Sequence, residues 1–292
     1  MNAPTDTKRS DDEPQKPLED GLYVVSTPIG NLGDLSFRAL DVLRRCDLIL
    51  AEDTRVAAKL LNAYGVKKRV ERYDDHAEDS RTAEIIEKLK AGARIALVSD
   101  AGTPLVSDPG YRLVTAAAEE DLRVIPIPGA SAVLAALAVC GLPTDRFLFA
   151  GFTPAKSAAR RSFLEEFAAI RATLVFYETG PRLAASLADM AVVLGDRPAA
   201  VCRELTKLYE TCIRGSLKAL AADPRLDAPR GEIVVVIGPG EDAVATETDV
   251  NRALADALTR QGPSAAAAEV AKALGLPKRD LYRRALDLKG AE

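Results

Sequence analysis

Two aspartates lie close together in one short stretch whose composition is typical of a ligand-binding loop. Asp100 and Asp108 belong to segment 98–109, which also carries Gly102 and two prolines. A carboxylate there can accept hydrogen bonds from a ribose diol or an amine. Gly102 lets the backbone approach a ligand closely or adopt a positive φ angle. The alternative is a rigid connection in which the aspartates and prolines only form turns.

A parallel sheet is predicted to position this segment. The apolar run 95–98 has the pattern of a buried strand, and residues 110–119 have the pattern of a helix. Strand–helix pairs recur through the first half of the chain, which predicts an α/β fold with helices on both faces of a parallel sheet. The predicted strands are 22–26, 47–51, 95–98 and 122–126, with a shorter one within 66–73, and the predicted helices are 37–45, 56–64, 81–91, 110–119 and 132–139.

Polar loops that carry glycine, proline or acidic residues follow four of these strands, at 27–34, 52–55, 99–109 and 126–132. The carboxyl ends of parallel strands share one edge of a sheet, and ligands of open α/β sheets bind at that edge. We therefore expect the four loops to converge on one site.

The second half of the chain predicts another α/β domain, with a mixed sheet, and then a small helical extension. Strands are expected over 146–150, 173–177, 199–202, 208–214 and 232–237, the last in a central position, and helices over 157–167 and 183–194. Helices 265–274 and 278–288 have the outline of a helix-turn-helix. The predicted organisation is a disordered tail over 1–19, domains over 20–144 and 145–240, and the extension over 241–292.

Composition excludes several classes of protein. The chain has 292 residues, 48% of them hydrophobic, and a net charge of −4, so there is no overall basic field for a nucleic acid. The single histidine excludes a multi-histidine metal site, and we expect no metal. The four cysteines lack C-x-x-C spacing and the N-terminus lacks a signal sequence, so we expect reduced thiols in a cytoplasmic protein. The usual glycine-rich dinucleotide and phosphate-binding motifs are absent.

A series of motifs supports a more specific interpretation than composition does. In chain order these are T-P-I-G-N-L-G-D (27–34), A-E-D-T-R (51–55), V-S-D-A-G-T-P (98–104), S-D-P-G (107–110), P-G-A-S (128–131), G-L-P (141–143), F-Y-E (176–178) and R-E-L-T-K (203–207). Over about residues 20–238 they resemble the tetrapyrrole methylase superfamily and, within it, the ribosomal RNA small subunit methyltransferase I family. The G-x-G-P-G and G-D-P loops of true tetrapyrrole methylases are missing, which favours the RNA branch.

The resemblance implies S-adenosylmethionine bound in a cleft between two α/β domains, and 2′-O-methylation of a cytidine in 16S ribosomal RNA of the small subunit. It also implies a homodimer. It assigns cofactor contacts to Pro28, Asp100, Ala101, Gly102, Thr103, Ser131, Ala132, Tyr177, Leu205 and Glu232. Two alternatives remain, a precorrin-type tetrapyrrole methyltransferase and a nucleic-acid-binding regulator that uses the helical tail.

Methyl transfer to a hydroxyl needs a general base. We favour Glu178 or Glu204, at strand ends of the second domain, with Lys207 or Lys156 stabilising the developing alkoxide. The alternative is that the neighbouring arginines pair with these glutamates and hold the loops. The other candidate bases are Glu52, Asp53 and His76, although Asp53 also suits a helix cap and His76 suits a solvated loop.

RNA binding needs cations at phosphates. Lys156, Arg160 and Arg161 have no acid between them and are expected as an RNA-binding patch beside the cleft, with a solvated basic face as the alternative. A second basic cluster comprises Lys67, Lys68, Arg69 and Arg72. For the basic helix 278–288 we favour a small helical cap over sequence-specific DNA reading.

Overall fold

The computed structural model describes residues 17–240, 247–274 and 276–290, without the side chains of 75–80, 247–249 and 290. Most of the predicted tail 1–19 therefore lies outside the described residues. The chain forms two compact units. The first contains the described residues up to Phe167 together with Thr173–Gly238, and the second contains Pro239–Glu292 with Ala168–Ala172.

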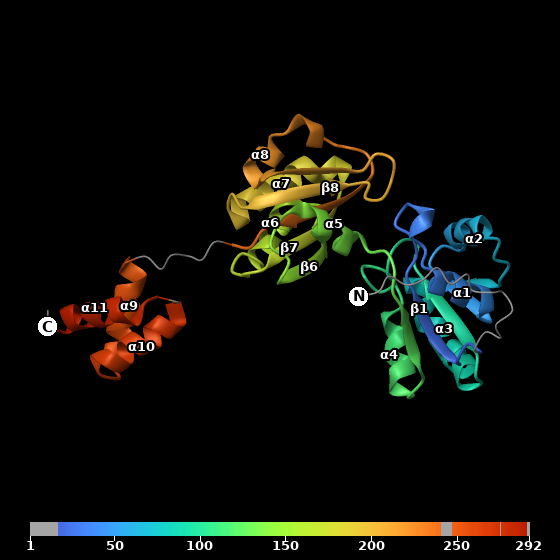
Figure 1. Ribbon diagram of the computed structural model, residues 1–292, viewed down its shortest axis with the longest axis horizontal. Helices are drawn as coiled ribbons and strands as arrows, with labels where there is room; N and C mark the ends of the chain where they lie inside the picture. The colour runs from blue at the N-terminus through green and yellow to red at the C-terminus, as the bar shows by residue number, and fades with distance from the viewer. Residues whose placement is uncertain (1–16, 241–246, 275, 291–292) are drawn as a thin grey trace, which may run out of the picture. The chain divides into compact units, whose positions relative to one another are not determined.

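The first sheet of the larger unit is parallel, as predicted, and has the strand order β3-β2-β4-β1-β5. Its strands are β1 (Gly21–Val25), β2 (Leu48–Ala51), β3 (Val70–Arg72), β4 (Arg94–Val98) and β5 (Val124–Ile127). The helices between them are α1 (Phe37–Arg45), α2 (Thr54–Ala63), α3 (Asp75–Lys90) and α4 (Tyr111–Glu119), and a 3-10 turn, η1 (Leu32–Asp34), precedes α1. Figure 1 shows strand β1 of this sheet between helices α3 and α4.

Alternating side chains of these strands build a core on each face of the sheet. Tyr23 and Ile49 pack with residues of α1 and α2, whereas their neighbours Leu22 and Leu50 pack with residues of α3 and α4. Successive side chains of a strand point to opposite faces, so both faces of a sheet covered by helices must be apolar. The continuous apolar runs of β2 and β4 meet that requirement.

The second sheet is mixed, with the order β6-β7-β10-β8-β9. Strands β6 and β7 are parallel, and the remaining pairs are antiparallel. As predicted, β10 is the central strand. The strands are β6 (Phe147–Phe152), β7 (Thr173–Thr179), β8 (Pro198–Arg203), β9 (Thr211–Ser216) and β10 (Glu232–Ile237), and the helices are α6 (Ser157–Glu165), α7 (Gly180–Leu194), α8 (Leu217–Ala221) and the 3-10 turn η2 (Pro224–Leu226).

Helix α5 (Ala132–Cys140) follows β5 of the first sheet but packs on the second. Its residues Val133 and Ala136 share a core with Val175, Cys202 and Val234 of β7, β8 and β10. The sequence of α5 is apolar on nearly every side, a pattern typical of a helix with more than one packing surface. The N-terminus of α5 is thereby placed beside strands of the second sheet.

Several sequence-based boundaries were wrong, among them the starts of α3, α7 and β9. Helix α3 begins at Asp75, so residues 75–78, predicted as loop, are helical. Acidic residues are favourable in the first turn of a helix, but they add no apolar period from which to predict it. His76 lies in this turn, and its side chain is outside the described residues. Strand β9 begins at Thr211, three residues late, because the chain first forms a turn with positive φ angles at Glu204 and Thr206.

The second unit contains α9 (Glu247–Leu258), α10 (Pro263–Leu274) and α11 (Lys278–Gly290), around a small core of its own. The predicted helix pair before the C-terminus is therefore present. All four cysteines are free thiols, as expected. Within the ranges that the structure describes, no helix is long and apolar enough to cross a membrane.

Candidate functional site

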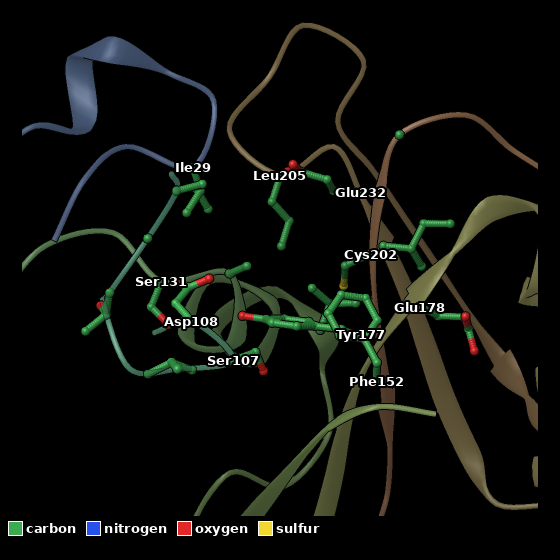
Figure 2. A pocket seen from close by; sticks show the side chains of 18 of the residues that line it. Ile29, Ser107, Asp108, Ser131, Phe152, Tyr177, Glu178, Cys202, Leu205 and Glu232 are labelled. Carbon is green, nitrogen blue, oxygen red and sulfur yellow. The ribbon is translucent and has the colours of Figure 1, made fainter. Parts of the chain in front are cut away.

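One pocket of about 280 Å³ lies in the larger unit, where loops of the first sheet meet strands of the second (Figure 2). Its lining comes from the central loop (residues 99–110), the start of α5, the ends of β6, β7 and β8, and the start of β10. The lining residues are Ile29, Ala101, Gly102, Thr103, Val106, Ser107, Asp108, Ser131, Ala132, Phe152, Tyr177, Glu178, Thr179, Cys202, Leu205, Gly231, Glu232, Ile233 and Val234.

The predicted convergence of the strand-end loops is present. The backbone groups of Thr27 and Gly102 exchange two hydrogen bonds, with N···O distances of 2.8 and 3.1 Å. The hydroxyl oxygens of Ser26 and Thr103 lie 2.9 Å apart, and the Thr103 hydroxyl also donates to the carbonyl of Ala130 at 3.3 Å. Three of the four loops are therefore joined by direct contacts at the edge of the first sheet.

The fourth loop, 52–55, is held by Asp100. The Asp100 carboxylate accepts a hydrogen bond from the backbone N–H of Asp53 at 3.1 Å. Asp53 in turn caps α2, since its carboxylate accepts from the backbone N–H of Arg55 at 2.8 Å, as a cap was expected to do. Asp100, Asp53 and Glu52 are not among the residues that line the pocket.

The central loop has an unusual backbone. Gly102 has a φ of 80°, and the non-glycine residues Leu105 and Ser107 have φ angles of 72° and 67°. Each such non-glycine conformation costs on the order of 1 kcal/mol or more, and backbone strain of this kind clusters at functional sites. Gly110 has a φ of 123°, and a Cβ there would lie 2.6 Å from the Leu97 side chain. The loop is thus held in one specific shape against the pocket.

Asp108 projects from this loop into the pocket lining, and its electrostatic environment is unfavourable. Burial raises the pKa of its carboxyl to about 6; a hydrogen bond from Ser99 opposes that change, and the charge of Asp100 adds to it. Across the pocket, burial together with Asp108 and Glu232 raises the pKa of the Tyr177 phenol to about 12. Our sequence-based candidates for the base omitted Asp108, although the S-D-P-G motif at 107–110 contained it.

Glu178 has the opposite environment. Its buried carboxylate accepts hydrogen bonds from the hydroxyls of Thr153 at 2.6 Å and Ser186 at 2.5 Å, and from the backbone N–H of Thr179 at 2.8 Å. The Arg182 guanidinium adds an ion pair at 3.1 Å. With its lone pairs occupied, Glu178 acts as a structural anchor for the end of β7, which is the alternative role that we had left open for it.

Glu204 and Lys207 do not line the pocket themselves but lie beside it. The Lys207 ammonium bridges the carboxylates of Glu204 and Glu232, at 2.9 Å from each. Burial alone would lower the pKa of Lys207, but these hydrogen bonds raise it overall. A hydrogen bond from the Glu232 backbone N–H, with one from Lys207, lowers the pKa of Glu204. The Lys207 chain also packs on Gly30, where any Cβ would overlap it.

The residues predicted to contact a cofactor divide into two groups. Pro28 and Asp100 are outside the lining. The structure brings the others together around one pocket, although they come from both halves of the sequence. These are Ala101, Gly102, Thr103, Ser131, Ala132, Tyr177, Leu205 and Glu232.

Of the expected basic patch of Lys156, Arg160 and Arg161, the structure leaves Lys156 and Arg161 exposed, but it buries Arg160 and so corrects our prediction for that residue. The Arg160 side chain is only 3% exposed and pairs with buried Asp189 at 2.6 Å. Arg161 is 50% exposed, but it also pairs with Asp189 at 2.6 Å. The acid comes from α7, nearly thirty residues along the chain, so local sequence could not reveal it.

The second basic cluster is also partly neutralised, since Arg69 pairs with Glu71 at 2.6 Å and Arg72 with Asp74 at 2.5 Å. Among the described side chains, no group of three or more His, Cys, Asp or Glu residues is arranged to hold a metal ion.

Solved structures share this fold. Diphthine synthase superposes with a TM-score of 0.58 at 17% identity, covering 74% of this chain and 89% of that chain. The methyltransferase CobJ superposes with a TM-score of 0.55 at 18% identity, covering 75% and 94%. At these identities the likeness concerns the fold alone.

Sequence relatives give a finer assignment. Proteins named ribosomal RNA small subunit methyltransferase I are 49% identical in Mesorhizobium japonicum (94% of this chain, 95% of the relative) and 52% identical in Erythrobacter litoralis (95% and 99%). The family of tetrapyrrole (corrin/porphyrin) methylases matches residues 21–221, and the RsmI C-terminal HTH domain matches 244–289. The chain therefore belongs to the tetrapyrrole methylase family and, within it, to the ribosomal RNA small subunit methyltransferase I group.

Proposed function

We propose that this methyltransferase uses S-adenosylmethionine to methylate the ribose 2′-hydroxyl of a cytidine in 16S ribosomal RNA, with the assembled small subunit as its substrate. The observation that carries the proposal is the match to relatives of that name along nearly their whole length, helical tail included. The pocket supports it, because the motifs specific to the RNA branch, 27–34 and 98–104, meet there through the contacts of Thr27 with Gly102.

The lining of the pocket suits S-adenosylmethionine in its apolar surface and its charge. Gly102 brings backbone to the cavity wall, and Ile29, Leu205 and Val234 offer apolar surface for a flat ring. The exposed carboxylate of Glu232 at the pocket edge suits a cofactor with a net positive charge. The loop 101–103, the start of α5 and Leu205 would hold the cofactor, whose sulfonium group supplies an electrophilic methyl.

The residues of this chain have three further tasks, which are to orient a ribose hydroxyl, exclude water and accept a proton. Phe152 lines the pocket, is 53% exposed and packs edge-on against Tyr177 with ring centroids 5.3 Å apart. An exposed ring at a pocket mouth suits the stacking of an unpaired base, as RNA-binding proteins commonly arrange it. Phe152 would thus hold the target cytidine while its ribose enters the pocket.

The second unit is proposed to bind the ribosomal RNA backbone. Helix α11 carries five basic and two acidic side chains, within a chain whose net charge is −4. On α11, Arg279 is 88% exposed, and Tyr282 and Arg283 are also exposed. Lys156 and Arg161 remain candidates on the first unit. A local basic surface on an acidic protein is suited to docking on a folded subunit.

Salt titration of binding tests this placement. Replacing Arg279 and Arg283 together by alanine should weaken binding to small subunits and flatten its dependence on salt by about two units of slope. Arg260→Ala is the matched control, because Arg260 pairs closely with Asp256 and Glu269, at 3.2 and 3.1 Å, whereas Arg279 lies 4.0 Å from Asp280. An unchanged salt slope in the double variant would remove α11 from the RNA-binding surface.

The decisive experiment for the reaction is methyl transfer from labelled cofactor to purified small subunits that lack the modification. We expect one methyl group per subunit, on a cytidine whose 3′ phosphodiester then resists alkali, since a blocked 2′-oxygen cannot attack the phosphate. Transfer to a precorrin and none to subunits would favour the tetrapyrrole alternative. Activity that survives removal of residues 241–292 would argue against the regulator alternative.

A cytoplasmic homodimer is part of the proposal. Because ribosomal subunits are the proposed substrate, we expect the enzyme in the cytoplasm, where these subunits are. Leu208 and Tyr209, in the turn before β9, are highly exposed apolar side chains that suit a surface between two copies. Sedimentation of the wild-type chain and of a variant with both residues changed to serine would test the dimer, and a monomeric wild-type protein would contradict it.

A further inference from the structure

Three acidic residues line the pocket, and they have very different surroundings. Glu178 is buried and has donors on both carboxylate oxygens. Glu232 is 72% exposed at the pocket edge and is paired with Lys207. Asp108 is half-buried on the opposite wall, where its hydrogen bond comes from the neutral Ser99 hydroxyl. Of the three, Asp108 is the carboxylate with the least compensation for its charge.

The backbone around Asp108 is built to hold it in place. Strained φ angles at Leu105 and Ser107 precede it, and Gly110 follows it against Leu97 with no room for a Cβ. Figure 2 shows Asp108 on the central-loop side of the pocket, with the ring of Tyr177 reaching toward it from β7. Asp108 therefore faces the cavity in which the proposed reaction would take place.

We propose that Asp108 is the general base of the methyl transfer, a role that rests on the proposed function. As the ribose 2′-oxygen forms its bond to the methyl carbon, the carbon–sulfur bond breaks and its electron pair stays on sulfur. The hydroxyl proton passes to a carboxylate oxygen of Asp108, which later releases it to water. Ser99 positions the carboxylate, and Tyr177 closes the wall opposite.

The electrostatics of the loop agree with this role. A base that is ionised at neutral pH but still holds a proton well has a pKa close to the working pH. Burial raises the pKa of Asp108 to about 6, Asp100 on the same loop raises it further, and Ser99 lowers it. Among the described side chains, Tyr177 of β7 also faces Asp108, and it stays neutral because its own pKa is about 12.

Asp108→Asn is the central variant, because it keeps the shape and removes the base. We expect kcat on small subunits to fall by a factor of about 10²–10⁴, while the Kd for S-adenosylmethionine and the KM for subunits change less than about threefold. Wild-type kcat should rise with pH and level off above about pH 6, and this step should be absent in the variant. Asp41→Asn is the matched control, because it makes the same change from acid to amide on α1, at a half-exposed residue outside the pocket lining. Asp108→Glu should recover part of the rate.

A second readout needs neither cofactor nor RNA. The carboxyl of Asp108 has a pKa of about 6 in the folded protein against 3.8 as its ordinary value, so the folded state holds the proton more tightly. Its contribution to stability is complete below pH 3.8 and is lost as the pH rises through 6. The amide side chain of the Asp108→Asn variant cannot ionise. The variant should therefore melt at a higher temperature than wild type at pH 8, and the two should converge near pH 4.

The outcomes separate the two proposals. If wild type methylates subunits and Asp108→Asn retains its kcat, or loses only cofactor affinity, Asp108 is not the base. If wild type transfers no methyl group to a ribose hydroxyl, the proposed function fails and the role of Asp108 fails with it. A variant that melts below wild type at pH 8 would show that the carboxylate is structural.

Discussion

The two walls of the pocket each hold a carboxylate, and they differ in how far its charge is compensated. On the wall built by the second sheet, Glu178 is enclosed by Thr153, Ser186 and Arg182, and each of the three donates to it. On the wall built by the central loop, Asp108 sits among strained backbone with Asp100 nearby and has a raised pKa. A buried acid with many donors stabilises the fold, whereas a poorly compensated acid has free energy to gain by taking up a proton.

The same division holds for arginines. Arg160 and Asp189, both almost fully buried, form an ion pair between α6 and α7, with further hydrogen bonds from Arg160 to the carbonyls of Pro154 and Ala155. Arg279 of α11 is almost fully exposed. Arg160 thus stabilises the framework of the first unit, whereas Arg279, 4.0 Å from Asp280, is exposed to a ligand.

The largest expected effect is on stability, from Glu178→Ala. Removing one partner of a buried, hydrogen-bonded charge pair leaves the other uncompensated, which costs about 3–5 kcal/mol. Urea denaturation at pH 7 should show this loss, whereas Asp108→Ala should show none beyond its small packing change. If Glu178→Ala were as stable as wild type and inactive, the roles of the two walls would be reversed.

Arg160→Ala is expected to be almost as damaging, with a loss of about 3 kcal/mol, because Asp189 stays buried and keeps only Arg161 and Ser157 as partners. Arg161→Ala should cost less than about 1 kcal/mol, since its side chain is half exposed. Thermal melting of the two single variants makes the comparison. Equal losses of stability in the two variants would show that the burial of Arg160 does not strengthen its ion pair.

Gly102→Ala should act on binding more than on the fold. Its φ of 80° strains any other residue, although a Cβ would meet Ile29 only at an ordinary 3.4 Å. We expect the Kd for S-adenosylmethionine to rise about tenfold, a change of about 1.4 kcal/mol. Gly65→Ala is the matched control, with a φ of 64° and open space around it. Calorimetric titration should find cofactor binding unchanged in that control.

The smallest effect is a difference in pH dependence. The hydrogen bond from the Glu232 backbone and the one from Lys207 lower the pKa of Glu204, so its contribution to stability is present at neutral pH and is lost as the pH falls through that pKa. Glu204→Gln should therefore cost less than about 1 kcal/mol at pH 7 and nothing in acid. This slope is opposite to that of Asp108→Asn, and melting curves at pH 4 and pH 8 compare the two. If the stability difference from wild type changed with pH in the same direction for both variants, the contrast between the two walls would be contradicted.

Much of the fold could be predicted because its signals are local. Buried strands appeared as apolar runs, α1 and β10 were placed to the residue, and glycine and proline marked the loops that follow the strands. The start of α3 and the turn before β9 could not be predicted, because polar helix turns and positive φ angles at Glu204 and Thr206 leave no periodic pattern.

The sequence by itself determined which loops lie at the edge of the first sheet, since parallel strands place their carboxyl ends together. It also determined the family, through motifs that keep their order along the chain. Only the tertiary structure decided that Glu178 is saturated, that Arg160 is buried on Asp189, and that Asp108 faces the pocket. The reason is physical: the charge, burial and pKa of a side chain depend on neighbours from distant parts of the chain, and residue type alone does not specify those neighbours.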